Sequence, residues 1–405
     1  MSDAGTESAG AGPGRAGEVL AAFLKLGLTS FGGPIAHLGY FRDELVVRRR
    51  WLDEKAYADL VALCQFLPGP ASSQVGFALG LLRAGPLGAL AAWAAFTLPS
   101  AILLVLFASG AAAFGGPVGG GVLAGLKIVA VAIVAQAVWG MARSLAPDRE
   151  RATIALGAVL LAILVAGSLG QIAAIAAGGL AGLLVCRGGA DADGPSLSFP
   201  VSRSGGMAAL VVFALLLAGL PLAAAATASQ GVALFDAFYR AGALVFGGGH
   251  VVLPLLDAEV VQGGWMDADR FLAGYGAAQA VPGPLFTFAA YLGAVVEPAP
   301  NGIIGASVAL VAIFLPGFLL LVGVLPFWNA LRVRRGAQAA MRGANAAVVG
   351  ILGAALYDPV FTGAIAGPYD FALALTCFVL LMAWRCPPWA VVLVAAGGGV
   401  LVGMA

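Results

Sequence analysis

Two positively charged side chains lie inside apolar stretches of this sequence, and each is followed by a glycine-rich break. Lys25 precedes Gly32-Gly33-Pro34, and Arg240 precedes Gly247-Gly248-Gly249. A charge placed in hydrocarbon costs about 2.5–3.5 kcal/mol on insertion scales, so such a residue marks a candidate functional site. A cation beside open backbone N–H groups favours the binding of an anion.

Two Pro-Gly-Pro turns supply a second kind of anion-binding element. They are Pro68-Gly69-Pro70 and Pro282-Gly283-Pro284. Proline is tolerated in the first turn of a helix, because the N–H that it lacks would be unpaired there. Each turn therefore predicts the start of a helix, whose free N–H groups and positive dipole end face a ligand. Ser72 and Ser73 after the first turn, and Thr287 after the second, add hydroxyl donors.

We expect no carboxylates in these apolar stretches, and therefore a cavity with cations and helix N-termini that selects anions. Gln65 and Gln279 recur at matching positions and are interpreted as polar cavity residues. Lys127, its polar counterpart Asn345, and His37 form a secondary set. The candidate substrate-binding residues are Lys25, Gly32, Gly33, Pro34, Gln65, Pro68, Gly69, Pro70, Ser72, Ser73, Arg240, Gly247, Gly248, Gly249, His250, Gln279, Pro282, Gly283, Pro284 and Thr287.

Each of these residues also has an interpretation that involves no ligand. Lys25 and Arg240 can extend to the membrane interface from amphipathic hairpins, and the glycines can serve close helix packing. Serine and threonine hydroxyls in helices often bond their own backbone. His37 and His250 are either proton carriers or hydrogen-bonded structural residues.

The pattern occurs twice along the chain. The segments Phe23–Gly27 and Phe31–Pro34 return 215 positions later, and the Pro-Gly-Pro turns are 214 positions apart. Leu98-Pro99 returns as Leu315-Pro316 at an offset of 217. A duplicated hydrophobic chain with helix breakers at matching positions of its halves is typical of a transporter whose binding site lies at the breaks.

Composition indicates an integral membrane protein. The chain is 61% hydrophobic and 10% charged, whereas soluble domains carry about 25% charged residues. We identify nine apolar runs of roughly the length that a membrane-spanning helix needs. They cover about residues 86–112, 121–143, 151–167, 170–187, 206–227, 301–328, 336–357, 370–384 and 388–405.

The sequence also argues against several classes of function. No cleavable signal peptide is expected, because residues 1–16 lack a basic start and an apolar core. The formal net charge is +1 and no basic cluster lies on a soluble domain, so no nucleic-acid partner is expected. The four cysteines and two histidines show no metal-ligand spacing. We therefore expect no metal, no cofactor and no catalytic residues.

Loop charges indicate that the two repeats have opposite orientations. Residues 40–55 carry four arginines, whereas the matching loop at 257–270 is mostly acidic. The uncharged loop at 111–121 contrasts in the same way with arginines at 332–342. Basic loops tend to stay in the cytoplasm, so the second repeat is expected to be inverted and the N-terminus to be cytoplasmic.

The expected fold is an all-α polytopic membrane protein, an inverted-topology duplicated repeat with re-entrant, broken helical hairpins. Each hairpin bends at one of the four breaks, and non-helical backbone at that depth must be buried or line a cavity. The expected hairpins cover residues 18–47, 56–84, 232–262 and 268–297. The expected parts are a disordered cytoplasmic tail (1–16), an N-terminal repeat (17–187), a cytoplasmic linker (188–205), a connecting transmembrane helix (206–230) and a C-terminal inverted repeat (231–405).

The motifs resemble a known family. FLKLGLTSFGGPIAHL, RRRWLDEKAYADLVALCQFLPGPASSQVG and, in the second copy, FGGGHVVLPLL with QAVPGP are similar to the chromate ion transporter family in its long, two-domain form. The resemblance covers residues 18 to about 360. The second copy departs from the first at Gly249, where the first has Pro34, and at Leu285-Phe286, where the first has Ala71-Ser72. The second copy is therefore poorer in hydroxyl groups.

The resemblance implies export of chromate across the inner (plasma) membrane and resistance to it, with sulfate as a competing anion. No nucleotide-binding P-loop is present, so the membrane potential or a proton gradient is the expected driving force. Chromate, membrane lipids and a second copy in a homodimer are the expected partners. Three alternatives stay open: a carrier of sulfate or another oxyanion, including an importer; a channel; and a membrane-embedded enzyme.

Overall fold

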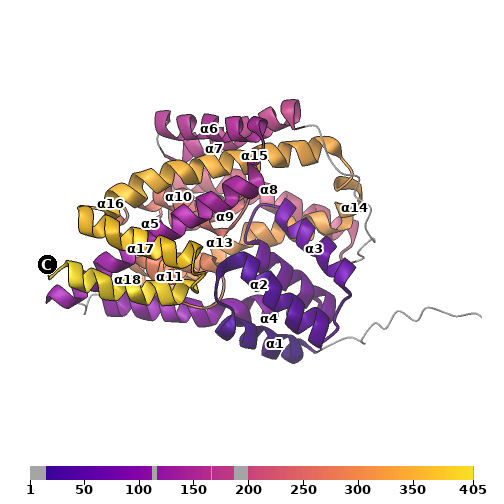
Figure 1. Ribbon diagram of the computed structural model, residues 1–405. Coiled ribbons are helices and arrows are strands. Elements are labelled where there is room, and N and C mark those ends of the chain that lie inside the picture. Colours follow the sequence, from indigo (N-terminus) through magenta and orange to yellow (C-terminus); the bar gives the residue numbers. More distant parts are fainter. Residues whose placement is uncertain (1–14, 112–115, 166, 187–198, 405) are drawn as a thin grey trace, which may run out of the picture.

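The structure is a computed structural model that describes residues 15–111, 116–165, 167–186 and 199–404 (Figure 1). All regular elements within these ranges are helices, which confirms the all-α class. The expected tail lies outside the described residues except for its last two positions, and most of the expected linker does so as well.

The N-terminal repeat begins with two helical hairpins. In the first, α1 leads into the glycine break, and α2 with the π-helical turn η1 returns beside it: Phe23 packs edge-on against Phe41, and Glu18 accepts from the Trp51 indole. The second hairpin joins α3, which Asp53 caps by accepting from the Ala56 N–H, to α4. The elements of this repeat are α1 (Ala16–Thr29), α2 (Gly33–Phe41), η1 (Arg42–Arg48), α3 (Glu54–Phe66), α4 (Ala71–Ala111), α5 (Gly116–Leu145), α6 (Arg149–Leu164) and α7 (Ser168–Val185).

Helix α4 folds back on itself at Ala84-Gly85. Both residues have non-helical dihedral angles, and φ of Gly85 is +65°, which glycine adopts without strain. The turn brings the backbones of Gly80 and Gly88 into contact. A Cβ added to Gly80 would lie only 2.3 Å from the Gly88 carbonyl oxygen, so a side chain does not fit there. The long spanning segment therefore starts at Pro86, where the predicted run 86–112 begins.

The C-terminal repeat follows the same order of elements after the connecting helix α8 (Arg203–Thr227). Helix α9 corresponds to α1, α11 to α3, α13 to the second part of α4, and α15 to α5. The elements are α9 (Gln230–Ala243), η2 (Gly249–Val251), α10 (Val252–Leu256), η3 (Asp257–Val261), α11 (Ala268–Ala278), η4 (Leu285–Thr287), α12 (Phe288–Val295), α13 (Gly302–Val324), η5 (Leu325–Phe327), α14 (Trp328–Leu331), α15 (Arg335–Ala355), η6 (Leu356–Phe361), α16 (Thr362–Ala364), α17 (Pro368–Met382) and α18 (Pro388–Val402).

Helix length divides the predicted spans into two groups. All nine predicted runs are helical over most of their described residues. In the described part of the chain, six helical segments are long and apolar enough to cross a membrane. Helices α6, α17 and α18 are shorter, at 16, 15 and 15 residues.

An ion pair between the repeats shows their relative orientation. Asp59, near the start of α3, accepts from Arg332, which follows α14 and lies just beyond the end of α13, at 3.1 Å. The start of α3 and the end of α13 therefore lie at the same face. The equivalent segment of the N-terminal repeat is the second part of α4. Both hairpins that precede it return to the face where they start, so this segment begins at that face and ends at the opposite one, whereas α13 ends at that face. The two repeats are thus inverted, as predicted.

The repeats interlock through their last helices. Helix α5 packs against α18 of the other repeat, and α15 packs against α7, as Figure 1 shows for α15 in orange beside α7 in magenta. Glycines allow the backbones to touch: a Cβ on Gly125 would lie 2.1 Å from the Ala395 carbonyl oxygen, and one on Gly343 would lie 2.0 Å from that of Gly178. Each repeat is therefore completed by helices of the other.

Candidate functional site

Backbone geometry requires glycine at all four breaks. The φ angle is +103° at Gly32, +74° at Gly247, +119° at Gly69 and +91° at Gly283. Residues with a Cβ avoid this left-handed region. Packing adds a second restriction, because a Cβ on Gly283 would lie 2.8 Å from the Ser100 hydroxyl.

The four breaks meet across the two repeats. The Gly69 N–H donates to the Val245 carbonyl at 2.7 Å, and the Gly283 N–H donates to the Ser30 carbonyl at 2.8 Å. Ser30 and Val245 are equivalent residues, each two positions before the first glycine of the break in its repeat. Each Pro-Gly-Pro turn is therefore tied to the glycine break of the other repeat.

The axis that relates the repeats passes through the glycine breaks. A Cβ added to Gly249 would lie 3.5 Å from Pro34 Cγ, and these two residues are equivalent at the offset of 215. Equivalent residues touch only near a symmetry axis. The predicted residues of both glycine breaks and both Pro-Gly-Pro turns are thus brought together.

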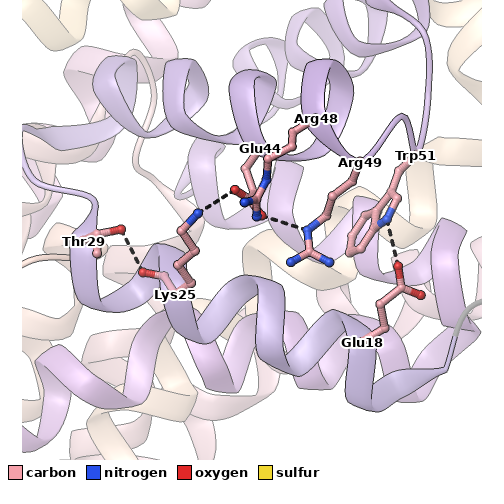
Figure 2. A network of polar contacts seen from close by, with 7 residues as sticks. All are labelled: Glu18, Lys25, Thr29, Glu44, Arg48, Arg49 and Trp51. Carbon is pink, nitrogen blue, oxygen red and sulfur yellow. Dashed lines mark hydrogen bonds and ion pairs between the residues drawn. The ribbon is translucent and has the colours of Figure 1, made fainter.

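Lys25 is paired with a carboxylate. Its ammonium donates to Glu44 Oε2 at 2.9 Å, and Figure 2 shows Arg48 and Arg49 on the other oxygen of the same carboxylate. The Glu44 side chain is 7% exposed and that of Lys25 is 51% exposed. The expectation that no carboxylate accompanies the intramembrane cations is therefore wrong.

Arg240 repeats this arrangement in the second copy. Its two terminal nitrogens donate to the two oxygens of Glu259 at 2.8 and 2.9 Å, and its Nε donates to Asp236 at 3.0 Å. Glu44 and Glu259 are equivalent at the offset of 215, a signal that the sequence reasoning missed. The carboxylate is the more buried partner in both copies, and a buried charge is costly without a counter-charge.

The secondary candidates are separated from one another. Lys127 donates to Asp269 at 2.8 Å and joins α5 to the start of α11. Its counterpart Asn345 lies at a break instead, because a Cβ on Gly247 would lie 3.7 Å from the Asn345 Oδ1. That oxygen is buried and has no hydrogen-bond partner among the described residues. The repeats therefore use this position differently.

The helices after the two Pro-Gly-Pro turns begin differently. The side-chain amide of Gln74 donates to the Pro68 carbonyl at 3.0 Å and holds the first turn, while the Gln74 N–H donates to Pro70. The N–H groups before it are free of intrahelical bonds, as at any helix N-terminus. After Pro284 the chain forms a 3₁₀ turn, and the Thr287 N–H and hydroxyl both donate to the Pro284 carbonyl.

The histidines have unrelated environments. His37 Nδ1 lies 3.4 Å from the Ser72 hydroxyl, and its ring meets the Phe96 ring edge-on at 5.3 Å. His250 Nδ1 lies 2.7 Å from the Tyr275 hydroxyl. His37 thus connects the first glycine break to the start of α4, whereas His250 connects the second break to α11.

The two glutamine-bearing helices differ in packing. Gln65 of α3 is exposed, whereas Gln279, just after α11, is half-buried. All residues from 271 to 278 of α11 are buried, and a Cβ on Gly276 would lie 2.1 Å from the Leu126 carbonyl oxygen of α5. Helix α3 buries only one side. The pseudo-symmetric halves are therefore packed tightly at α11 and loosely at α3.

A groove of about 450 Å³ lies between α5, η6 and α17. Its lining is apolar apart from Tyr357 and includes Val131, Phe361 and Phe378. It shares no residue with the four breaks and offers no set of donors for an anion.

Comparison with known proteins gives a consistent family. The family model "Chromate transporter" matches residues 17–183 and 232–400. The chromate transport protein of Pseudomonas aeruginosa is 30% identical over 390 residues, which cover 94% of this chain and 90% of that protein. The probable chromate transport protein of Synechococcus elongatus is 30% identical over 328 residues, or 76% and 75% of the two chains. The chromate transport protein of Cupriavidus metallidurans is 28% identical over 336 residues, or 82% and 79%. No solved structure matches the chain. With both repeats matched, the chain belongs to the chromate transporter family.

Proposed function

We propose that this protein is a secondary transporter that exports chromate from the cytoplasm across the inner membrane and thereby confers chromate resistance. The observation that carries the proposal is the meeting of the four breaks, through the Gly69–Val245 and Gly283–Ser30 hydrogen bonds. Broken helices at a repeat interface near mid-membrane are where transporters bind their substrates. A tetrahedral dianion there reaches helix N–H groups from both repeats.

A cluster of positive charge in the N-terminal repeat supports entry of the anion from one side. Lys25, Arg48 and Arg49 surround the single carboxylate of Glu44, so the cluster carries a net charge of +2. The arginine-rich loop beside it favours a cytoplasmic location. A positive cluster at an entrance raises the local concentration of anions and speeds their arrival.

The equivalent cluster of the C-terminal repeat has the opposite sign. Arg240 faces both Glu259 and Asp236, so this cluster carries a net charge of −1. Inversion of the repeats places it toward the other side of the membrane. A negative cluster disfavours return of a dianion from outside, and the two clusters together favour outward transport.

The membrane potential is sufficient to drive this export. A dianion that leaves a negative-inside cell gains about 2.3 kcal/mol per charge per 100 mV, or about 4.6 kcal/mol in all. At about 1.4 kcal/mol per factor of ten, this sustains an outward gradient on the order of a thousandfold. The transport cycle therefore needs no nucleotide hydrolysis.

A carrier of sulfate or another oxyanion is the second candidate. The groups at the breaks are backbone amides and hydroxyls, which recognise charge and shape rather than the central atom of the anion. Competition between chromate and sulfate distinguishes the two substrates by their apparent affinities.

The test is uptake of labelled chromate into inverted membrane vesicles under an imposed potential, positive inside the vesicle. We expect saturable uptake that sulfate inhibits, that phosphate inhibits less, and that disappears when the potential is collapsed. Vesicles without the protein give the background. Uptake that requires ATP, or no potential-driven flux of any oxyanion by folded protein, would refute the proposal, and flux that does not saturate would indicate a channel.

A further inference from the structure

Four buried polar atoms of the N-terminal repeat, on the segments that flank the first glycine break and on α4, have no hydrogen-bond partner within the described part of the chain. They are Ser30 Oγ, His37 Nε2, Ser73 Oγ and Thr97 Oγ1. Each of the four residues is at most 2% exposed. Native proteins leave few buried polar atoms unpaired, so a group of them indicates a polar ligand.

The contacts of His37 place its ring against α4. Its Nδ1 lies 3.4 Å from the hydroxyl of Ser72, in the first turn of α4 and next to Ser73. Its ring packs edge-on against Phe96, which precedes Thr97. The imidazole that follows the glycine break therefore lies against both the start and the middle of α4.

The C-terminal repeat has apolar side chains at three of the four equivalent positions: Val245 for Ser30, Val252 for His37 and Phe314 for Thr97. Ser73 corresponds to Thr287, whose hydroxyl donates to the Pro284 carbonyl, and the neighbouring Ser72 corresponds to Phe286. The rings of Phe286 and Phe314 pack with their centroids 5.7 Å apart, and both are buried. The same arrangement of helices is thus built with valine and phenylalanine, so packing does not require the polar residues of the N-terminal repeat.

We propose that each chain holds one tetrahedral oxyanion, bound in the N-terminal repeat by His37, Ser73, Thr97 and the free N–H groups at the start of α4. Phe286 and Phe314 close the equivalent place in the C-terminal repeat. This inference rests on the proposed transport function and adds to it the location and number of binding sites.

The chemistry of the donors suits a dianion that must also be released. Hydroxyl and N–H donors form charge-assisted hydrogen bonds with its oxygens, and the dipole of α4 favours negative charge at this end. The nearby cations are already paired, Lys25 with Glu44 and Arg240 with Glu259. An anion held by neutral donors therefore does not form a tight ion pair that would trap it.

The test is equilibrium binding of labelled sulfate and labelled chromate to the purified full chain in nanodiscs. We expect one anion per chain in the wild type. Ser73→Ala and Thr97→Val each remove one hydroxyl donor and should weaken binding about 10- to 100-fold. Ser109→Ala is the matched control on the same helix, because the Ser109 hydroxyl is exposed and donates to the Val105 carbonyl. It should bind as the wild type does.

A second variant tests the closed counterpart. Thr97→Phe introduces the aromatic ring that Phe314 provides in the other repeat and should abolish binding in protein that elutes as folded. If this variant does not fold, the near-isosteric Thr97→Val still decides the question.

The outcomes separate this inference from the proposed function. Two anions per chain, or unchanged affinity in folded Ser73→Ala and Thr97→Val, would overturn the single site, while potential-driven chromate flux in those variants would leave the transport function standing. A wild type that neither binds nor transports an oxyanion would overturn both.

Discussion

Removal of the Arg240 guanidinium should destabilise the protein more than any other single change at its intramembrane charges. Arg240→Ala would leave Glu259 and Asp236 without their shared cation, and these side chains are 13% and 6% exposed. Breaking a buried ion pair by removing one partner costs about 3–5 kcal/mol. Arg240 itself is 22% exposed, so we expect about 3 kcal/mol, or roughly a hundredfold in the unfolding equilibrium.

The equivalent change in the other repeat provides the comparison. Lys25→Ala removes one of three cations from Glu44, and Arg48 and Arg49 remain in contact with that carboxylate. Lys25 is 51% exposed, so solvent screens its pairing and the expected loss is below about 1 kcal/mol. The two substitutions occupy matching positions, yet their predicted effects differ by about 2 kcal/mol.

Unfolding of the purified protein in mixed micelles with increasing SDS would measure both losses. Arg240→Ala combined with Glu259→Ala should recover part of the stability, because it also removes one of the stranded carboxylates. The reasoning would be refuted if Arg240→Ala lost no more stability than Lys25→Ala, or if the double substitution were as unstable as the sum of the single ones.

Three further predictions concern packing, the breaks and the charge clusters. Gly182→Ala should lower the free energy of unfolding by about 1–3 kcal/mol, because its Cβ would lie 2.4 Å from the Ala339 carbonyl oxygen of α15. Gly179→Ala on the same helix is the control: its Cβ would have its nearest neighbour at 3.8 Å, so it should be neutral in the same SDS unfolding assay. Gly283→Ala should abolish chromate flux in vesicles, because it places a Cβ at a φ of +91° and 2.8 Å from Ser100 Oγ. Gly219→Ala in α8, whose Cβ would have no neighbour within 4 Å, should transport normally. Normal flux in both variants would contradict the role of the turn. Arg48→Gln should raise the KM for chromate entering from the cytoplasmic side and flatten its dependence on ionic strength, because it lowers the positive charge of the Glu44 cluster; an unchanged salt dependence would argue against attraction by that cluster.

Much of the fold follows from local properties of the sequence. The apolar runs require helices in a bilayer, and the Gly-Gly and Pro-Gly-Pro segments favour breaks, because glycine adopts positive φ without strain and two prolines close together remove two helical N–H donors. The turn at Ala84-Gly85 and the caps at Asp53 and Asp267 are local in the same sense. Inversion of the repeats was predictable because arginines are distributed unevenly between the loops.

The charged part of the candidate site was not predictable in this way. Glu44 lies 19 residues after Lys25, and Glu259 lies 19 residues after Arg240. By sequence, Glu44 and Glu259 fall in the loops expected at 40–55 and 257–270, so no carboxylate is expected beside the intramembrane cations. Only the hairpin, which folds η1 back onto α1, brings the carboxylate to the ammonium.

By itself the sequence determined the class, the duplication, the inversion and the places where helices break, because these depend on hydrophobic length, backbone sterics and loop charge. Only the tertiary structure decided that each Pro-Gly-Pro turn bonds to the glycine break of the other repeat, and that polar atoms of Ser30, His37, Ser73 and Thr97 are buried without partners among the described residues while Phe286 and Phe314 pack together in the other repeat. The physical reason is that these contacts join residues far apart in the chain, and their free energy depends on how the two repeats pack rather than on any single segment.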